Sequence, residues 1–518
     1  MRLFALSDDA LSEEAEREAY ISDLGLEFLR TTDKCATSDY STLAERFKAS
    51  RIPDTPSEPM GYINYLAEHV IPHSINTSSP RFIGHMTTAL PHIMRSLGKL
   101  VTTLNQNQVK METSKSLSFC ERQALAMMHG MLYGLPEEFY QQHAQDPDST
   151  LGMVVSGGTF ANIAALWCAC NASLGPTDDI PGVDKVGLQA ALTARGYAKA
   201  VIIGSGLMHY SLEKAASLLG LGTDNLIKVP VDNRHRINLT ALREAVAACR
   251  ELNQHIVAIV GIAGTTDSGA VDPLAEMAEI SRQAGVHFHV DAAWGGAIVF
   301  SRRHRHKLRG IELADSVTID GHKQLYLPMG IGMVLLRHPR LAKVIEKNAR
   351  YIVRASSIDL GKRALEGSRP AMVLFLHAAL HLFGSRGYEF LIDEGIRKAQ
   401  YMAKIIQSRP EFELLCDPQA NIINYRVIPE PLHVRAAQGE LTVFDNQSIN
   451  EFNIQLQRLQ RQTGRTFVSR TTLDVSRYGR DLPIVALRAV IANPLTTEAD
   501  ITAVLNHQIA IAADLKQV

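Results

Sequence analysis

Short apolar runs alternate with helical patterns in the middle of the chain, from about residue 150 to residue 340. Segments such as 160–170 and 239–249 place their apolar residues at helical spacing. Between such segments, short apolar runs with the composition of buried strands occur at 153–156, 200–203, 226–229, 256–262, 286–291, 316–319 and 332–336. This alternation predicts an α/β fold with a mostly parallel sheet that is covered by helices on both faces.

The pattern differs on both sides of this region. The beginning of the chain is rich in helical patterns, and after about residue 385 longer helices are mixed with a few strands. A chain of 518 residues is longer than one hydrophobic core usually serves. We therefore expect an N-terminal helical segment (1–90), a large ligand-binding domain (91–385) and a smaller C-terminal α+β domain (386–518). Residues 350–370 show weak periodicity and predict a long loop.

The composition argues against several classes of protein. The chain has 53 Lys and Arg against 54 Asp and Glu, whereas proteins that bind nucleic acid or anionic membranes need a basic excess. No cationic stretch followed by an apolar run stands at the N-terminus, and the apolar runs are too short to cross a bilayer. The six cysteines are scattered, which favours free thiols. We expect a cytoplasmic protein that binds neither nucleic acid nor membrane.

Three motifs stand after predicted strands, at the sheet edge where parallel sheets bind ligands. Gly157, Gly158 and Thr159 lie between a strand and a helix, where backbone N–H groups can hold a phosphate. Asp291 ends a second strand, and a buried carboxylate needs a cationic partner. Lys323 follows a third strand and can form a Schiff base with a carbonyl. Each motif alone has a commoner explanation, but together they fit one ligand with a phosphate, a ring nitrogen and an aldehyde.

A metal site is the alternative for the second motif. His287, His289 and Asp291 alternate along one face of the predicted strand. No further cluster of candidate ligands accompanies them, so we favour the cofactor interpretation and expect no metal.

Four motifs carry a resemblance to a known family. They are His209–Ala215 (HYSLEKA), Gly264–Thr266 (GTT), His289–Gly296 (HVDAAWGG) and His322–Lys323, in this order. Their order and spacing resemble the signature of the pyridoxal phosphate (PLP)-dependent group II amino-acid decarboxylases. The likeness extends from Ser79–Phe82 to Leu487–Pro494 and is greatest to the bacterial aspartate 1-decarboxylase branch. It implies fold type I, which is the aspartate aminotransferase-like fold, PLP as cofactor, and a homodimer with active sites at the subunit interface.

The resemblance also implies roles for residues around the cofactor. Lys323 would hold PLP as a Schiff base, Asp291 would keep the pyridine nitrogen protonated, and His209 would stack on the ring. His322 would lie near the phosphate or the transferred proton. The remaining cofactor contacts are expected from Gly157, Gly158, Thr159, Thr266 and Ala293.

Other residues are assigned to the substrate by the same resemblance. Arg488 matches an arginine that binds the distal carboxylate in glutamate decarboxylases, and its guanidinium suits a carboxylate. His85 and Asn107 would also face the substrate. Tyr351 is the candidate loop proton donor. Asp320 replaces an asparagine that contacts the phosphate in several branches, and since an anion beside a phosphate is unfavourable, we expect Asp320 to point elsewhere.

The sequence therefore predicts a PLP-dependent α-decarboxylase of a small acidic amino acid. L-aspartate, giving β-alanine for pantothenate synthesis, is the leading substrate. Glutamate and cysteine sulfinate are alternatives, because one methylene separates aspartate from glutamate. A PLP aldehyde-lyase is an alternative of another class, because Asp-x-His-Lys followed by Pro328 and Gly330 is also similar to the sphingosine phosphate lyases. A non-catalytic protein on this fold is the third reading, and the presence of Lys323, Asp291 and His209 argues against it.

Overall fold

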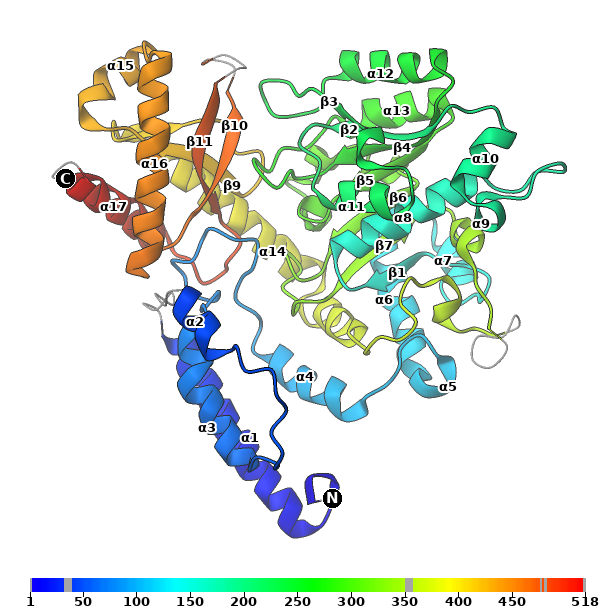
Figure 1. The fold of residues 1–518 in the computed structure, drawn as a ribbon, viewed down its shortest axis with the longest axis horizontal. Helices are drawn as coiled ribbons and strands as arrows, with labels where there is room; N and C mark the ends of the chain where they lie inside the picture. The colour runs from blue at the N-terminus through cyan, green and yellow to red at the C-terminus, as the bar shows by residue number, and fades with distance from the viewer. Residues whose placement is uncertain (1, 32–39, 350–356, 476–477, 479–481, 516–518) are drawn as a thin grey trace.

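The computed structural model describes residues 2–31, 40–349, 357–475, 478 and 482–515 (Figure 1). Its largest part is a seven-stranded sheet of order β1-β7-β6-β5-β4-β2-β3. The strands are β1 (Gly152–Val155), β2 (Ala200–Ser205), β3 (Leu226–Val229), β4 (His255–Ile262), β5 (His287–Asp291), β6 (Ser316–Asp320) and β7 (Gly332–Leu336). All strands predicted from the apolar runs are present, with nearly the predicted bounds.

The sheet is mostly parallel, as predicted. Strands β6, β5, β4, β2 and β3 pair in parallel, whereas β7 runs antiparallel to both of its neighbours, β1 and β6. Residues 321–331, which join β6 to β7, are too few for a helical crossover, which needs about a dozen residues or more. The short connection therefore returns β7 antiparallel beside β6.

Helices cover both faces of the sheet because successive strand residues point to opposite sides. In β2, the side chains of Val201 and Ile203 join the core on one face of the sheet, and the side chain of Ile202 joins the core on the other face. On the first face lie α6 (Ser116–Tyr133), α12 (Leu239–Glu251) and α13 (Leu274–Ala284), and on the second lie α8 (Gly158–Ser173), α10 (Leu188–Ala194) and α11 (Ser211–Leu218). The expected three-layer arrangement is confirmed (Figure 1).

The C-terminal part has its own antiparallel sheet, of order β10-β11-β9-β8, and its own core. Its elements are β8 (Phe412–Leu414), β9 (Ile422–Val427), α15 (His433–Gln438), α16 (Val443–Thr463), β10 (Ser469–Asp474), β11 (Pro483–Val490) and α17 (Glu498–Leu515). Helix α14 (Val373–Ser408) reaches from one part to the other and is interrupted at Gly384, where φ is +57°. The predicted boundary at 385–386 lies beside this interruption, and the three domain boundaries stay predictions.

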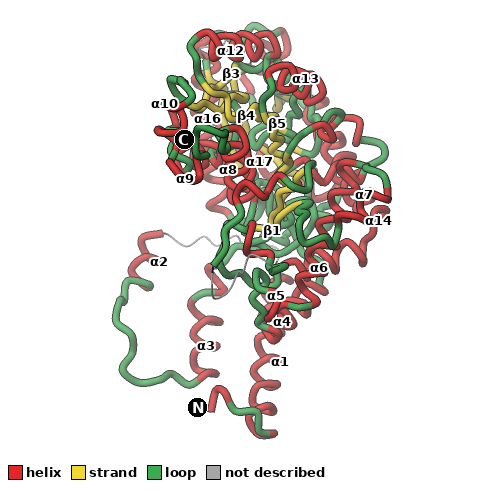
Figure 2. Tube along the Cα trace, turned by 90° about the vertical axis from the view of Figure 1, so that its right-hand side faces the viewer, coloured by secondary structure: helices red, strands yellow, loops and turns green. Residues whose placement is uncertain are grey.

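The N-terminal helices extend away from both sheets (Figures 1 and 2). Helix α1 (Asp8–Arg30) contacts α3 (Pro59–His69) and buries none of its side chains. No helix in the described part of the chain is long and apolar enough to cross a membrane. The remaining helices are α2 (Tyr40–Arg46), α4 (Ile93–Leu104), α5 (Met111–Ser114), α7 (Glu137–His143) and α9 (Val183–Val186). Short 3-10 helices lie at Arg2–Phe4, Ile71–His73, Thr223–Asn225, Gly295–Phe300, Arg305–Leu308, Ile311–Leu313, Leu341–Ile345, Leu360–Arg363 and Glu430–Leu432.

Candidate active site

One cavity of about 430 Å³ lies at the carboxyl ends of β1, β4, β5 and β6. The three sequence motifs meet there because these four strands point in the same direction. All nine residues expected at the cofactor line it, namely Gly157, Gly158, Thr159, His209, Thr266, Asp291, Ala293, His322 and Lys323. Asn162 and Asp320 line it as well, although neither was expected to contact a ligand.

The turn between β1 and α8 needs its glycines for two different reasons. Gly157 has φ of +134°, which a residue with a Cβ rarely adopts. A Cβ on Gly158 would lie 2.8 Å from Asp320 Oδ2 and 3.3 Å from the Ala293 Cβ. The two glycines leave the first N–H groups of α8 open to the cavity, and the positive end of a 16-residue helix favours a phosphate there.

Asp291 is a buried carboxylate that has no ion-pair partner among the described residues. Its Oδ1 accepts a hydrogen bond from the Ala293 amide at 3.1 Å, and its Oδ2 accepts one from Asn162 Nδ2 at 2.9 Å. A buried anion of this kind is stabilised by a cation that reaches it from the cavity. The protonated pyridine nitrogen of PLP is such a cation, so this site fits the cofactor.

Asn162 joins Asp291 to two histidines. A carboxylate only accepts hydrogen bonds, so the Asn162 amide nitrogen faces Asp291, and it also donates to Ser211 Oγ at 2.9 Å. The Ser211 hydroxyl then donates to His209 Nδ1 at 2.9 Å, and the Ser211 amide reaches the same nitrogen at 3.3 Å. On the other side, Asn162 Oδ1 accepts from His289 Nε2 at 3.0 Å. Asp291 therefore fixes the orientation of the Asn162 amide and, through it, the proton on His289 Nε2.

Burial keeps both histidines of this network neutral at pH 7. It lowers the pKa of His289 to about 4, against the opposing effect of the Asp291 charge. It also lowers the pKa of His209, with Asp291 acting in the opposite direction. Since His209 Nδ1 accepts a hydrogen bond from a backbone amide, its neutral ring carries the proton on Nε2.

The metal alternative finds no support in this geometry. His287 Nε2 and His289 Nδ1 both bond to Ser316 Oγ, at 2.8 and 2.9 Å. In the described part of the chain, no three His, Cys, Asp or Glu side chains are grouped so that they could hold a metal ion.

Asp320 lies at the phosphate end of the cavity, which contradicts the expectation that it points elsewhere. Its side chain is only 4% exposed, and its Oδ2 lies 2.9 Å from Lys323 Nζ. The same oxygen is directed at Gly158, as the distance to a Cβ at that position shows. The expectation considered only repulsion from a phosphate, whereas the ammonium of Lys323, three residues later on the same turn, attracts the carboxylate.

The three residues assigned to the substrate do not line this cavity in the same chain. Arg488 comes nearest, because its Nε donates to the carbonyl of Thr266, which does line the cavity, at 2.7 Å. His85 stacks on Phe467 with ring centroids 5.4 Å apart. Asn107 donates to Ser368 Oγ at 3.2 Å on a separate part of the surface. Tyr351 lies outside the described residues, and the predicted roles of all four stay predictions.

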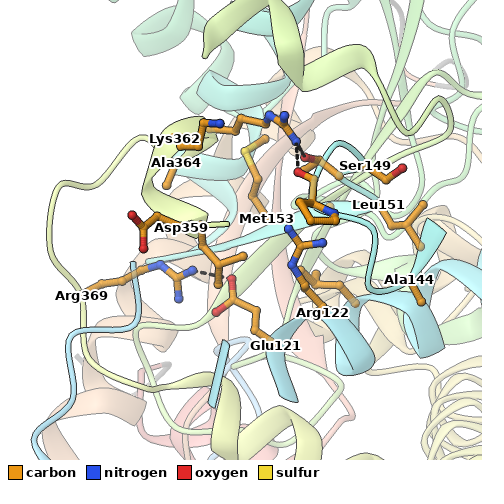
Figure 3. A pocket seen from close by; sticks show the side chains of 16 residues that line it. Glu121, Arg122, Ala144, Ser149, Leu151, Met153, Asp359, Lys362, Ala364 and Arg369 are labelled. Atoms are coloured by element: carbon orange, nitrogen blue, oxygen red, sulfur yellow. Dashed lines mark hydrogen bonds and ion pairs between the residues drawn. The ribbon is translucent and has the colours of Figure 1, made fainter. Parts of the chain in front are cut away.

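A second, smaller cavity of about 40 Å³ is lined by residues of α6, β1 and the segment 359–369 (Figure 3). Glu121 of α6 and Arg369 form a buried ion pair beside it. The Arg369 amide donates to Asn107 Oδ1 at 3.4 Å, and its carbonyl accepts from the Gln108 amide at 2.9 Å. The pair therefore holds the segment around Asn107 against α6.

Comparison with known proteins identifies the family. Residues 45–428 match the pyridoxal-dependent decarboxylase conserved domain. The chain belongs to this family. It is 42% identical to an aspartate 1-decarboxylase of Aliivibrio fischeri, over 94% of the chain and 89% of that protein, and 30% identical to an L-aspartate decarboxylase of Metarhizium robertsii, over 72% and 70%. A crystal structure of mouse CSAD superposes with a TM-score of 0.81 at 23% identity and covers 98% of the chain and 99% of that structure.

Family membership confirms the predicted cofactor, fold type and enzyme class. The protein is a PLP-dependent amino-acid decarboxylase of fold type I. The aldehyde-lyase and the non-catalytic readings are therefore set aside. Asn162 was not among the predicted site residues. A sequence signal existed, because Asn162 is a polar residue within the apolar stretch of α8. The structure buries its side chain, which is only 1% exposed and therefore needs hydrogen-bond partners.

Proposed function

We propose that this decarboxylase acts on L-aspartate and releases β-alanine and carbon dioxide, which would supply a pantothenate precursor. The observation that carries the proposal is the free hydrogen-bonding capacity of Arg488 beside the cavity. The likeness to the Aliivibrio fischeri aspartate 1-decarboxylase supports the same substrate.

The guanidinium of Arg488 is buried and partly unpaired. Its Nε is bonded to the Thr266 carbonyl, and its Nη1 lies 3.2 Å from both the Gly84 carbonyl and Ser469 Oγ. Its Nη2 is buried without a hydrogen-bond partner among the described residues. Burial lowers the pKa of Arg488 to about 10 and nearby Asp267 opposes this shift, so the group is still charged at pH 7. A buried, charged and unpaired donor next to a substrate cavity suits a carboxylate.

The carboxylate bound by Arg488 would be the distal one. A cation on the departing carboxylate would stabilise the substrate more than the transition state, in which neutral carbon dioxide is forming. Binding of the distal carboxylate costs nothing in the reacting step. It also selects acidic substrates over aromatic ones.

The residues that line the cavity have complementary tasks in this proposal. PLP, when bound, withdraws the electron pair that the departing carbon dioxide leaves behind. Asp291, fixed by Asn162 and by the Ala293 amide, would supply a negative charge to the pyridine nitrogen. His209, neutral and with its proton on Nε2, would contact the ring, and Lys323 would hold the cofactor through Nζ. Tyr351 remains the predicted proton donor.

Carbon dioxide release by the PLP-loaded enzyme tests the substrate. We expect kcat/KM for aspartate to exceed that for glutamate by about 10- to 200-fold, as one methylene in a fitted pocket typically gives. Cysteine sulfinate and tyrosine complete the comparison. A preference for glutamate or cysteine sulfinate would refute the aspartate proposal without affecting the enzyme class.

Substitution of Arg488 tests whether this residue binds the distal carboxylate of the substrate. Arg488→Ala should raise KM for aspartate strongly, and Arg488→Lys should restore only part of the binding because a lysine lacks the guanidinium fork. Arg470→Ala, on the adjacent strand β10, is the matched control, because among the described residues the Arg470 guanidinium donates to the carbonyl of Ile454 and does not line the cavity. An unchanged KM in Arg488→Ala would exclude Arg488 from substrate binding.

We also propose a homodimer with active sites at the interface, in the cytoplasm. Two observations support the dimer. Asn107 lies away from the cavity of its own chain, and α1 carries exposed apolar side chains at Leu11, Ile21, Leu26 and Leu29. A second copy that covered α1 would bury this apolar surface.

A further inference from the structure

The carboxylate of Asp320 lies where the cofactor phosphate is expected. Asp320 ends β6 and pairs in register with Gly332 of β7. A Cβ on Gly332 would come within 2.7 Å of Asp320 Oδ1, and one on Gly158 within 2.8 Å of Oδ2. The carboxylate is therefore enclosed between β7 and the first turn of α8.

Only one of the two Asp320 oxygens is paired. Oδ2 forms the ion pair with Lys323 Nζ at 2.9 Å, and His322 Nε2 lies 3.8 Å from the same oxygen. Oδ1 is buried and has no hydrogen-bond partner among the described residues. A buried carboxylate oxygen without a donor is costly.

Carboxylates lie on both sides of the glycine turn that is expected to hold the phosphate. Glu366 accepts hydrogen bonds from both the amide and the hydroxyl of Ser156, which lines the cavity, at 3.1 and 2.9 Å. The charged and titratable groups around Asp320 are Lys323, His322, His209, Lys214, Asp291 and Glu366. Two carboxylates, those of Asp320 and Glu366, thus lie beside this turn before a phosphate dianion arrives.

We propose that Asp320 is a positioning residue that holds the Lys323 ammonium in the cofactor-free protein and couples cofactor capture to the uptake of one proton. Two like charges in contact disfavour the doubly charged state, so either the carboxylate or the phosphate takes up a proton on binding. Capture also breaks the Asp320–Lys323 pair. With PLP, the Lys323 ammonium would give its proton to the pair formed by Asp320 and the phosphate, the neutral amine would add to the aldehyde carbon, and the two remaining amine hydrogens would leave with the aldehyde oxygen as water. A ligand that does not react with Lys323 must take the proton from solvent.

The inference goes beyond the proposed substrate and depends only on the use of PLP. Binding of pyridoxine 5′-phosphate isolates the phosphate effect, because this compound has an alcohol in place of the aldehyde and does not react with Lys323. Its dissociation constant should be measured by fluorescence titration from pH 5.5 to pH 8.5. For the wild type we expect the constant to rise as pH increases above the second phosphate pKa of about 6, because free ligand then loses the proton that the complex requires.

Asp320→Asn should remove this dependence. We expect the variant to bind pyridoxine 5′-phosphate about tenfold or more tightly than the wild type at pH 8.5, and equally well at pH 5.5, where the proton is already present. Asp320→Ser serves the same purpose if the asparagine variant does not fold. Asp315→Asn is the matched control, because it removes the same charge at the opposite end of β6. The dissociation constant of this variant for pyridoxine 5′-phosphate should equal that of the wild type at every pH.

Thermal melting gives a second readout that does not depend on activity. In the cofactor-free protein, Asp320→Asn should lower Tm, because the Lys323 ammonium loses its partner, whereas in the PLP-loaded protein it should not. Weaker binding of pyridoxine 5′-phosphate by Asp320→Asn at every pH would overturn the proposal, since Asp320 would then help to hold the phosphate. If the dissociation constants of the wild type and of Asp320→Asn kept the same ratio from pH 5.5 to pH 8.5, the proposed proton uptake would be wrong.

Discussion

Asn162 shows how one uncharged residue can fix several groups of an active site. Its amide has only two hydrogens and one oxygen, and all three are used, by Asp291, Ser211 and His289. Because Asp291 only accepts hydrogen bonds, the amide has one orientation, and its Oδ1 then accepts the proton on His289 Nε2. The tautomer of His289 is thus set by a residue on helix α8.

Removal of this amide should impair the reaction without unfolding the protein. Asn162→Ala leaves Asp291 Oδ2 and His289 Nε2 without these partners, which should cost about 1–3 kcal/mol of folding stability. It should also lower kcat, because Asp291 is then held less firmly. Steady-state kinetics and PLP binding check this. Asn171→Ala, on the same helix, is the control, because Asn171 bonds to the Val344 carbonyl away from the cavity. Unchanged kinetics in Asn162→Ala would show that Asp291 is held adequately by the Ala293 amide alone.

Sequence reasoning found the site through residue types that are unusual at strand ends. Glycines, an aspartate and a lysine after three apolar strands predicted the cavity lining, since parallel strands bring their carboxyl ends together. The sequence did not predict the directions in which the side chains point. Asp320 turns toward Lys323, and Arg488 reaches Thr266 from the other sheet, because of contacts that only the folded chain creates.

At the scale of elements, the strands were predictable and their mutual directions only in part. The strands β2, β4 and β6 are buried on both faces, so their sequences do not alternate between polar and apolar residues. The short length of these apolar runs was therefore the signal that predicted strands. The antiparallel direction of β7 follows from the short connection after β6. That connection carries Lys323, so the same feature that reverses β7 also positions the lysine at the cavity.

The attachment of α6 to the segment before α14 depends on one buried ion pair. The side chains of Glu121 and Arg369 are 2% and 7% exposed, and removal of one partner leaves the other charge buried and unpaired (Figure 3). We expect Glu121→Ala to destabilise the protein by about 3–5 kcal/mol, measured by denaturant unfolding. Replacement of both residues, with Glu121→Leu and Arg369→Met, should recover most of this loss.

The control for this pair is an ion pair on the surface. Glu279 and Arg282 on α13 are 49% and 72% exposed, and exposed pairs contribute little to stability. Glu279→Ala should therefore unfold like the wild type. If Glu121→Ala also unfolded like the wild type, the segment around Asn107 would be held by its backbone hydrogen bonds and not by the ion pair.

At the scale of the whole molecule, the N-terminal helices stand out because they make few stabilising contacts with the rest of their own chain. The C-terminal end of α1 is fixed, because the side-chain Nδ2 of Asn76 donates to the carbonyls of Phe28, Leu29 and Thr31. The rest of α1 contacts α3 but has no buried side chain. A helix that exposes apolar side chains in this way is stabilised by a further surface, and in the proposed homodimer the second copy provides it.

Two charges on α1 should therefore dissociate the dimer. Leu26 and Leu29 are 37% and 39% exposed, and glutamates in their place would be buried without partners on association. We expect the Leu26→Glu/Leu29→Glu variant to sediment as a monomer while the wild type sediments as a dimer, and to lose decarboxylase activity because the proposed dimer places its active sites at the interface. Leu252→Glu, at the end of α12, is the control and should stay dimeric and active. A monomeric and fully active wild type would refute the shared site, and a dimeric Leu26→Glu/Leu29→Glu variant would place the interface elsewhere on the chain.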